Sequence, residues 1–98
     1  NNAQVAAEVV GAKIALIHSE LSEALEAVRD SYFDESGITV SPYDKHLPNH
    51  LSIAIELADV IIRTLDLVAA LGLDIGESLL AKHEYNKTRE HRHGGKAL

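Results

Sequence analysis

The chain has no cysteine, no methionine and no tryptophan among its 98 residues, and only two prolines. The lack of cysteine excludes disulfide and thiolate chemistry. No apolar run free of charge is long enough to span a bilayer, and no signal peptide is recognisable. We therefore expect a soluble, cytoplasmic protein with no membrane partner. Because it begins with Asn1 and contains no methionine, we also expect the chain to be trimmed.

Basic residues are scarce over most of the chain. Residues 1–81 hold 4 Lys or Arg and 13 Asp or Glu, whereas residues 82–98 hold 5 and 2. The first part therefore has a net charge of −9 and the second of +3. A nucleic-acid binder needs a basic face to displace counterions, so the acidic body argues against a nucleic-acid polymer as a partner. The short basic tail suits a small anion, or it is a solvated end.

Period-two alternation is also lacking, so no sheet is predicted, and "GITV" (37–40) is at most a short extended piece. Three segments have helical character instead, at about 3–32, 50–71 and 75–89. The loop 34–49 contains Gly37, Pro42 and Pro48, and residues 90–98 form the basic tail. We expect a single all-α domain over residues 1–98, built as an antiparallel bundle of three main helices.

The second helical segment is apolar in nearly every direction around its axis. Its large apolar residues are Leu51, Ile53, Ile55, Leu57, Val60, Ile61, Ile62, Leu65, Leu67 and Val68. A helix of this kind is surrounded by partners, and two neighbours from one subunit would cover only part of it. We therefore expect oligomerisation to complete the bundle.

The polar residues of this segment fall on one narrow stripe. Ser52, Glu56, Asp59, Arg63 and Asp66 are spaced four, three, four and three apart, within an arc of roughly 80° at 3.6 residues per turn. One interpretation is a solvent-facing stripe in which Arg63 bridges Asp59 and Asp66 at helical spacing. The other is a site, because the stripe is unusually narrow and carries short carboxylates rather than lysines.

The first helical segment offers a second pair of acids. Glu20 and Glu23 lie at the edge of its apolar face, whereas Glu26 lies on the solvent side. If the first two helices form an antiparallel hairpin, Glu23 and Glu56 lie ~15 Å and ~10 Å from the turn at 1.5 Å rise per residue. The two acid pairs are then expected to converge across one helix interface.

Four convergent carboxylates cannot all stay ionised and partly buried without a counter-charge. Arg63 can offset one of them, and a divalent cation could offset more. Ligands that offer only oxygen favour Mg²⁺, Mn²⁺ or Ca²⁺ over Zn²⁺. Mg²⁺ typically leaves coordination positions to water and phosphate oxygens, which makes phosphate chemistry the functional hypothesis.

The third helical segment changes from apolar to cationic along one face, on which Ile75, Leu79, Lys82, Asn86 and Arg89 are spaced four, three, four and three apart. Lys and Arg also suit the negative end of a helix dipole, which would explain them without a ligand. Asn is a poor helix former and is harder to explain in this way. We predict that these three polar side chains contact a phosphate chain.

The segments "ELSE" (20–23) and "ELAD" (56–59) fit the ExxE…ExxD signature of the MazG-like nucleotide pyrophosphohydrolases, the all-α NTP pyrophosphatase group. The flanking segments "KIALIHSELSEALEAVR", "IELADVIIRTLDLVAALGLDI" and "KHEYNKTREHRHGGK" also resemble this family, so the likeness covers most of residues 13–96. It implies an all-α homodimer or homotetramer. The implied activity is Mg²⁺-dependent hydrolysis, with Mn²⁺ as a substitute, of a nucleoside triphosphate to a monophosphate and pyrophosphate.

The resemblance also implies roles for individual residues. It assigns the metal ligands to Glu20, Glu23, Glu56 and Asp59. We expect Glu20 to orient or deprotonate the attacking water. The phosphate contacts fall to Lys82, Asn86 and Arg89. We expect Arg63 and Asp66 to support the metal ligands from outside.

Two features leave the substrate open. The gap between the two motifs is longer than in many members of the family, and its loop 34–49 would form a lid, a base pocket or a contact with a partner subunit. Some relatives sandwich the base with a tryptophan, which this chain lacks. Two alternatives therefore remain: hydrolysis of phosphoribosyl-ATP, as in related histidine-pathway enzymes, or a non-enzymatic helical interaction module with Arg63 at the centre of structural salt bridges.

Overall fold

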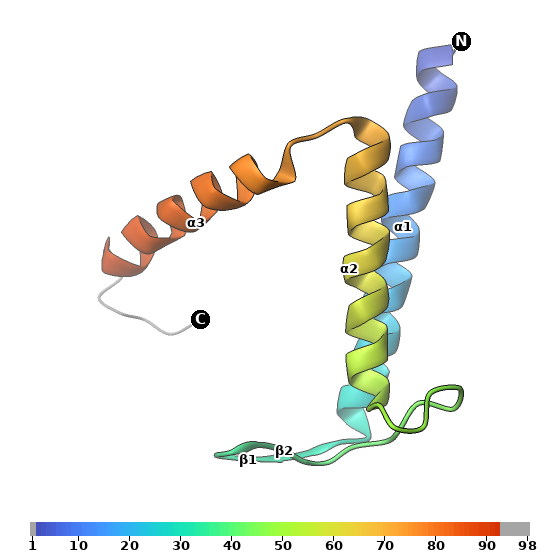
Figure 1. Cartoon of the computed structure of the whole chain (residues 1–98), viewed down its shortest axis with the longest axis vertical. Coiled ribbons are helices and arrows are strands. Elements are labelled where there is room, and N and C mark those ends of the chain that lie inside the picture. Colours follow the sequence, from blue (N-terminus) through green and yellow to red (C-terminus); the bar gives the residue numbers. More distant parts are fainter. Residues whose placement is uncertain (1, 93–98) are drawn as a thin grey trace. The chain divides into compact units, whose positions relative to one another are not determined.

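The computed structural model describes the backbone of residues 2–92 and the side chains of residues 6–89, so most of the predicted basic tail lies outside the described residues. Its elements are α1 (Asn2–Arg29), β1 (Tyr32–Asp34), β2 (Gly37–Val40), α2 (Ser52–Leu71) and α3 (Ile75–Arg92) (Figure 1). The mainly helical fold is confirmed. None of the described helices is long and apolar enough to cross a membrane.

The chain divides between Leu67 and Val68 into two compact units, and each is described by itself. The first unit contains α1, the two strands and most of α2. The second contains the end of α2 together with α3. The single domain and the three-helix bundle therefore stay predictions.

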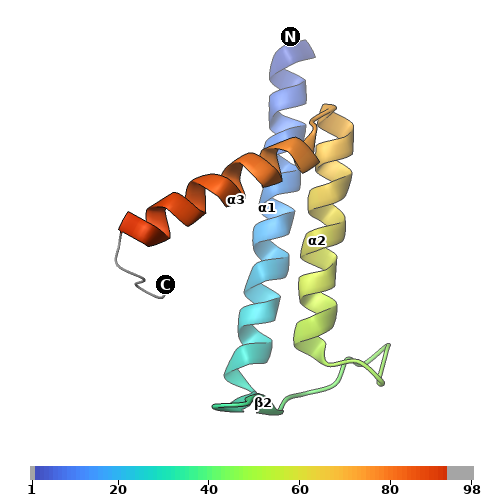
Figure 2. The same cartoon turned by 60° about the vertical axis from the view of Figure 1, so that its left-hand side comes forward.

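In the first unit, α1 and α2 lie side by side and run in opposite directions, as both views show (Figures 1 and 2). Ala24 and Ala27 of α1 and Leu67 of α2 are buried. The two alanines have no bulk beyond Cβ, so the helices can approach closely. The three- and four-residue spacing predicts an apolar stripe on α1 made of Ile14, Ile17, Leu21, Ala24 and Val28. Ala24 is buried and Ile17 and Val28 are half-buried, whereas Ile14 and Leu21 are 45% and 44% exposed, so the stripe was partly wrong. The buried side of α1 is the row that contains the two alanines.

The first helix ends at Arg29, which corrects the expected end near Tyr32. The backbone N–H of Ser31 donates to the carbonyl of Val28 at 3.0 Å, and its hydroxyl donates to the carbonyl of Ala27 at 2.7 Å. These bonds satisfy carbonyls that an α-helix leaves free at its C-terminus. The chain can then leave the helix axis directly after this turn.

A short antiparallel hairpin follows α1. Its strands pair Tyr32 with Val40, Phe33 with Ile38 and Asp34 with Gly37, with an irregularity between Tyr32 and Phe33. Gly37 has a φ of 121°, which suits glycine. The extended piece "GITV" is thus confirmed as β2, whereas its partner β1 was not expected, and the region predicted as a loop begins within the hairpin.

The rest of the loop is held by its own hydrogen bonds. The carboxylate of Asp44 accepts the backbone N–H groups of His46 and Leu47, both at 2.9 Å. The N–H of Asp44 donates to the carbonyl of His50 at 2.8 Å, and Tyr43 pairs with Leu51. At the start of α2, the backbone N–H of Ser52 donates to the carbonyl of Pro42 at 2.8 Å. The loop therefore fixes the start of the helix that carries two of the acids.

In the second unit, Gly72 ends α2 in the left-handed conformation with a φ of 66°. The N–H of Leu73 donates to the carbonyl of Val68 at 3.1 Å, as in a Schellman motif. Asp74 then caps α3, because its Oδ1 accepts the N–H of Glu77 at 3.1 Å. The helix extends to Arg92, three residues beyond the predicted end.

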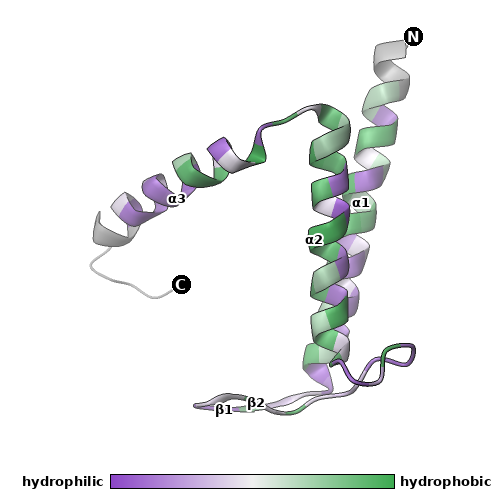
Figure 3. Ribbon diagram, viewed as in Figure 1, coloured by the Kyte–Doolittle hydropathy of each residue, from purple (hydrophilic) through white to green (hydrophobic). Residues whose placement is uncertain are grey.

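Large apolar side chains remain exposed on α2, which is predominantly hydrophobic along the side seen in Figure 3. Ile61 and Ile62 are 60% and 56% exposed, and Leu57 and Leu65 are also exposed. The sequence predicted an apolar helix with partners on most sides. Within the first unit, α1 covers only one of those sides.

Candidate metal centre

Three predicted ligands meet between α1 and α2. Glu20 of α1 and Glu56 and Asp59 of α2 each offer a carboxylate oxygen, and these oxygens lie within 4.8 Å of one another. All three residues are half-buried. We call these three residues the acidic cluster. Two motifs separated by more than thirty residues are thus brought to one point, as the spacing argument expected.

The helix geometry explains the meeting. Glu20 is four residues before Ala24, which packs toward α2, so both lie on one face of α1. Glu56 and Asp59 are three residues apart on α2 and share the face that turns toward α1. The side chains therefore point into the helix interface from both sides.

Glu56 has the most unusual environment of the cluster. Its Oε2 is buried and has no hydrogen-bond partner within the part of the chain that the structure describes. Burial raises the pKa of Glu56 to about 7, with further contributions from hydrogen bonding and charge at Glu23 and then at Glu20. A carboxyl in this position holds a proton near neutral pH unless a cation compensates its charge.

The fourth predicted ligand, Glu23, lies at the rim. Its side chain is largely exposed, and it is not one of the three residues whose oxygens meet. It is close enough to Glu56 to raise the pKa of that carboxyl. Glu26, expected to point away, is exposed and pairs with Arg29. The structure thus separates the inner acids from the solvent-facing one as the sequence predicted.

Arg63 pairs with the acidic cluster. Its Nε donates to Oε1 of Glu20 at 3.2 Å, and the side chains of Glu20 and Arg63 are 13% and 44% exposed. The interpretation in which Arg63 bridges Asp59 and Asp66 is not what the described side chains do, because Arg63 forms its ion pair across the helix interface. Helical spacing could identify only neighbours on the same helix.

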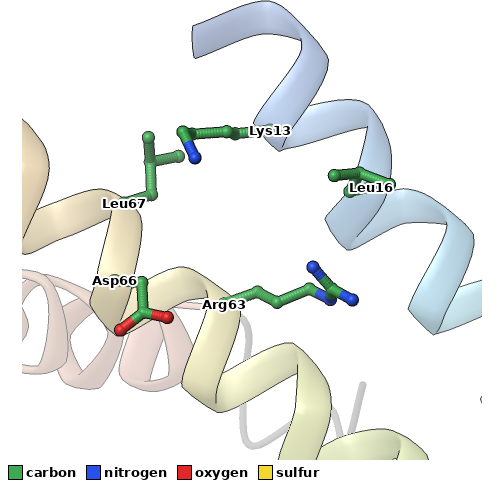
Figure 4. A pocket seen from close by; sticks show the side chains of 5 residues that line it. All are labelled: Lys13, Leu16, Arg63, Asp66 and Leu67. Carbon is green, nitrogen blue, oxygen red and sulfur yellow. The ribbon is translucent and has the colours of Figure 1, made fainter. Parts of the chain in front are cut away.

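A small cavity adjoins this ion pair and contains a residue that the sequence argument missed. It is about 80 Å³ and is lined by Lys13, Leu16, Arg63, Asp66 and Leu67. We call it the cationic pocket. Figure 4 shows Lys13 reaching from α1 and Arg63 reaching from α2 toward the space between the helices. Lys13, Leu16 and Glu20 are spaced three and four apart, and this spacing was the available signal.

A second hollow lies at the hairpin end of the first unit. It is about 350 Å³ and is lined by Ile38, Thr39, Val40, Ser41, Tyr43 and Leu51. Ser41 is buried, and its hydroxyl shares a 2.7 Å hydrogen bond with that of Ser31. Leu51 is five residues before Glu56, so the hollow is roughly 8 Å along α2 from the cluster at 1.5 Å rise per residue.

The three predicted phosphate contacts lie in the second unit. Lys82, Asn86 and Arg89 are exposed on α3. The ammonium of Lys82 and the guanidinium of Arg89 lie 4.9 Å and 5.7 Å from the centre of the Tyr85 ring. Such cation–π contacts restrain both basic side chains. Their approach to the acidic cluster stays a prediction.

The acidic cluster has the donors that a hard divalent cation prefers. It offers carboxylate oxygens from two helices, and one oxygen of Glu56 lacks any partner among the described residues. One arginine offsets only part of this negative charge. Mg²⁺ or Mn²⁺ fits such a set of ligands, whereas Zn²⁺ prefers nitrogen and sulfur.

No protein-family model, no curated protein and no solved structure matches this chain. The geometry of the acidic cluster and the two acidic motifs are therefore the basis for assigning a function.

Proposed function

We propose that this protein is a nucleotide pyrophosphohydrolase that cleaves a nucleoside triphosphate to the monophosphate and pyrophosphate. The environment of Glu56 supports this proposal most strongly, because its buried Oε2 accepts no hydrogen bond from a described donor and, after burial itself, the groups that raise its pKa are the carboxyl groups of Glu23 and Glu20. A purely structural cluster would be expected to pair its buried oxygen with a donor. A cluster that binds a cation leaves that oxygen for the metal.

In this proposal Glu20, Glu56 and Asp59 hold Mg²⁺, or Mn²⁺ in its place, with Glu23 completing the ligands from the rim. The bound cation would offset negative charge on the phosphoryl oxygens. Arg63 positions Glu20 through the hydrogen bond from its Nε. The metal ligands would thus be fixed before substrate binds, which lowers the cost of reaching the reactive arrangement.

Glu20 is the proposed catalytic residue. Its carboxylate accepts a proton from the water molecule that attacks the α-phosphorus. The bond from this phosphorus to the bridging oxygen breaks, and pyrophosphate leaves with the bonding electrons. General bases of this kind typically contribute about 10²–10⁴-fold to the rate.

Other parts of the chain have supporting roles in the proposal. Lys82, Asn86 and Arg89 contact phosphates, and the hollow beside Tyr43 receives the base. The exposed apolar residues of α2 pack in a homodimer or homotetramer that acts in the cytoplasm. A second copy of the chain would remove these apolar side chains from water, where their exposure is unfavourable.

The direct test is release of pyrophosphate from a panel of nucleoside triphosphates, with Mg²⁺ and with a chelator. We expect release with at least one nucleotide, dependent on the metal. Glu56→Gln should reduce the rate by roughly a hundredfold or more, because a metal ligand supports several kcal/mol of transition-state stabilisation. Glu26→Gln, the same substitution at an exposed position on the solvent side of α1, is the matched control and should leave the rate unchanged.

A binding measurement separates the enzyme from a structural salt-bridge module. Mg²⁺ at about 100 times its Kd should raise the free energy of unfolding by ~2.7 kcal/mol, and Glu56→Gln should abolish this gain. Absence of release from every nucleotide, together with no stabilisation by Mg²⁺, would leave the module as the correct interpretation. Phosphoribosyl-ATP belongs in the panel because preferential hydrolysis of that compound would keep the chemistry and change the substrate.

A further inference from the structure

The cationic pocket lies beside the acidic cluster, and none of the residues that line it is a proposed metal ligand. Its two positive side chains come from different helices, Lys13 from α1 and Arg63 from α2. Its volume of about 80 Å³ would hold roughly two or three water molecules, and a tetrahedral anion could replace them. The position and size of the pocket suit one phosphate group.

Arg63 is oriented for a further ligand. Only its Nε is used by Glu20, and the other two guanidinium nitrogens donate no hydrogen bond to any of the residues described. The guanidinium extends toward α1 over the pocket (Figure 4). The planar fork of arginine matches the oxygens of a phosphate, and a carboxylate that holds one edge leaves the other nitrogens available.

The ammonium group of Lys13 is also available to bind an anion. It forms no ion pair among the side chains that the structure describes, although Asp66 lines the same cavity. Two cationic side chains thus face one carboxylate around the pocket. An anion that enters would meet two donors and the repelling carboxylate of Asp66, and the Glu20 carboxylate already holds the Nε edge of Arg63. The affinity for an anion therefore depends on these two acids as well as on the two bases.

The hollow beside Tyr43, the acidic cluster and the cationic pocket follow one another along the pair of helices. From Glu20 to Lys13 the chain runs seven residues along α1, and from Asp59 to Arg63 four residues along α2. At 1.5 Å rise per residue these are ~10 Å and ~6 Å, both away from the hairpin. The hollow beside Tyr43 lies at the opposite end, next to the hairpin. The acidic cluster therefore lies between an apolar hollow and a cationic pocket.

We propose that Lys13 and Arg63 form a subsite for the terminal phosphate of a polyphosphate ligand, and for one phosphoryl group of the inorganic pyrophosphate that hydrolysis releases. The choice of ligand rests on the proposed function. In this arrangement the nucleoside end points toward the hairpin and the leaving group toward the N-terminal part of α1. Asp66 limits the affinity, which favours release of the product.

Calorimetric titration of inorganic pyrophosphate into the full chain tests the subsite without turnover, in Mg²⁺ and with no nucleotide present. Lys13→Met should weaken binding about tenfold, because a charge-assisted hydrogen bond to phosphate is lost. The matched control is Lys45→Met, which removes the same charge from an exposed loop position and should leave the affinity unchanged. Methionine is a good helix former, so α1 should persist, and circular dichroism checks this.

Asp66→Asn supplies a change of opposite sign. Removal of the opposing carboxylate should tighten pyrophosphate binding roughly threefold, since repulsion across a few ångströms of partly solvated space is lost. A variant that merely disturbed the fold would weaken binding instead. Opposite shifts in Lys13→Met and Asp66→Asn support the subsite. Equal affinities of the wild type, Lys13→Met and Lys45→Met, or no pyrophosphate binding by the wild type, would overturn it.

The outcomes distinguish this inference from the proposed function. If nucleotides are hydrolysed and Lys13→Met binds pyrophosphate as the wild type does, the subsite is wrong and the function stands. If pyrophosphate binds through Lys13 and no nucleotide is hydrolysed, the subsite is correct and the proposed reaction is wrong.

Discussion

At the scale of single residues, Glu56 combines burial with like charge. Its Oε2 is removed from water without a replacement donor, and two further glutamates lie beside it. Burial and like charge both disfavour the ionised carboxyl, so its pKa rises to about 7 from the model-compound value of 4.5. The ionised form of Glu56 is therefore unfavourable in the folded chain, and either a proton or a bound cation can compensate its charge.

This cost predicts how the stability of the metal-free chain depends on pH. The unfolded chain releases the Glu56 proton near pH 4.5, whereas the folded chain retains it until about pH 7. The folded state therefore binds more protons in this window, and the free energy of unfolding should fall as pH rises through it. Urea unfolding in a chelator, followed by circular dichroism at pH 5, 6, 7 and 8, measures the slope.

Glu56→Gln should remove this contribution to the slope, because the amide does not titrate. Glu26→Gln, on an exposed position, should keep it. The same pH dependence in wild type and Glu56→Gln would show that the burial of Glu56 does not cost stability in the way proposed.

Single-residue reasoning from the sequence went further for the acids than for the bases. The spacing within each motif placed Glu20, Glu23, Glu56 and Asp59 toward one interface, and the structure brings carboxylate oxygens of all of them except Glu23 within 4.8 Å of one another. It did not identify Glu20 as the partner of Arg63, nor Lys13 as a neighbour of that pair. Helical periodicity gives the face of each residue, but contacts across an interface also depend on how the two helices are rotated and shifted.

At the scale of elements, α1 and α2 approach through small residues. Ala24 and Ala27 are buried, whereas the larger Ile14 and Leu21 are exposed. The stripe predicted from the spacing included Ala24 together with Ile14 and Leu21, and it left Ala27 at the edge of the apolar face. The acids instead require a close approach of the helices, which a leucine in the row of alanines would prevent. The sequence thus predicted both helices and part of the buried face of α1, but not the burial of Ala27 or the exposure of Ile14 and Leu21.

We predict that Ala24→Leu destabilises the first unit. Three added carbon atoms in a close helix contact should force the helices apart and lower the free energy of unfolding by ~1–3 kcal/mol. Urea unfolding measures this effect, and the gain from Mg²⁺ should also fall because the acids separate. Ala12→Leu, on an exposed position of the same helix, is the control and should change stability by less than about 0.5 kcal/mol. Equal effects of the two changes would contradict this packing.

The hairpin shows a limit of pattern reading at the same scale. β1 has three residues and β2 four, too few for period-two alternation to be recognisable. A two-stranded ribbon of this length is marginal alone, so its stability depends on contacts outside the segment. The end of α1 at Arg29 is set by the backbone and hydroxyl bonds of Ser31, which a search for apolar periodicity does not detect.

At the scale of the whole molecule, the apolar face that α1 leaves exposed on α2 is the basis for predicting the association state. Ile61 and Ile62 are more than half exposed, and Leu57 and Leu65 are exposed beside them. Each apolar side chain left in water forgoes about 1.5–3 kcal/mol that burial would provide. The same sequence pattern that predicted partners around this helix therefore predicts association of identical chains.

We predict that the wild-type chain is a dimer or tetramer and that Ile61→Glu shifts it toward the monomer. A buried carboxylate without a partner is costly, so the dissociation constant should rise at least about a hundredfold, which corresponds to ~2.8 kcal/mol. Light scattering coupled to size-exclusion chromatography at several concentrations measures the mass. The control is Ser19→Glu, which adds the same charge on an exposed position of α1. A wild-type chain that stays monomeric at every concentration would contradict the prediction, and so would an Ile61→Glu variant that associates as the wild type does.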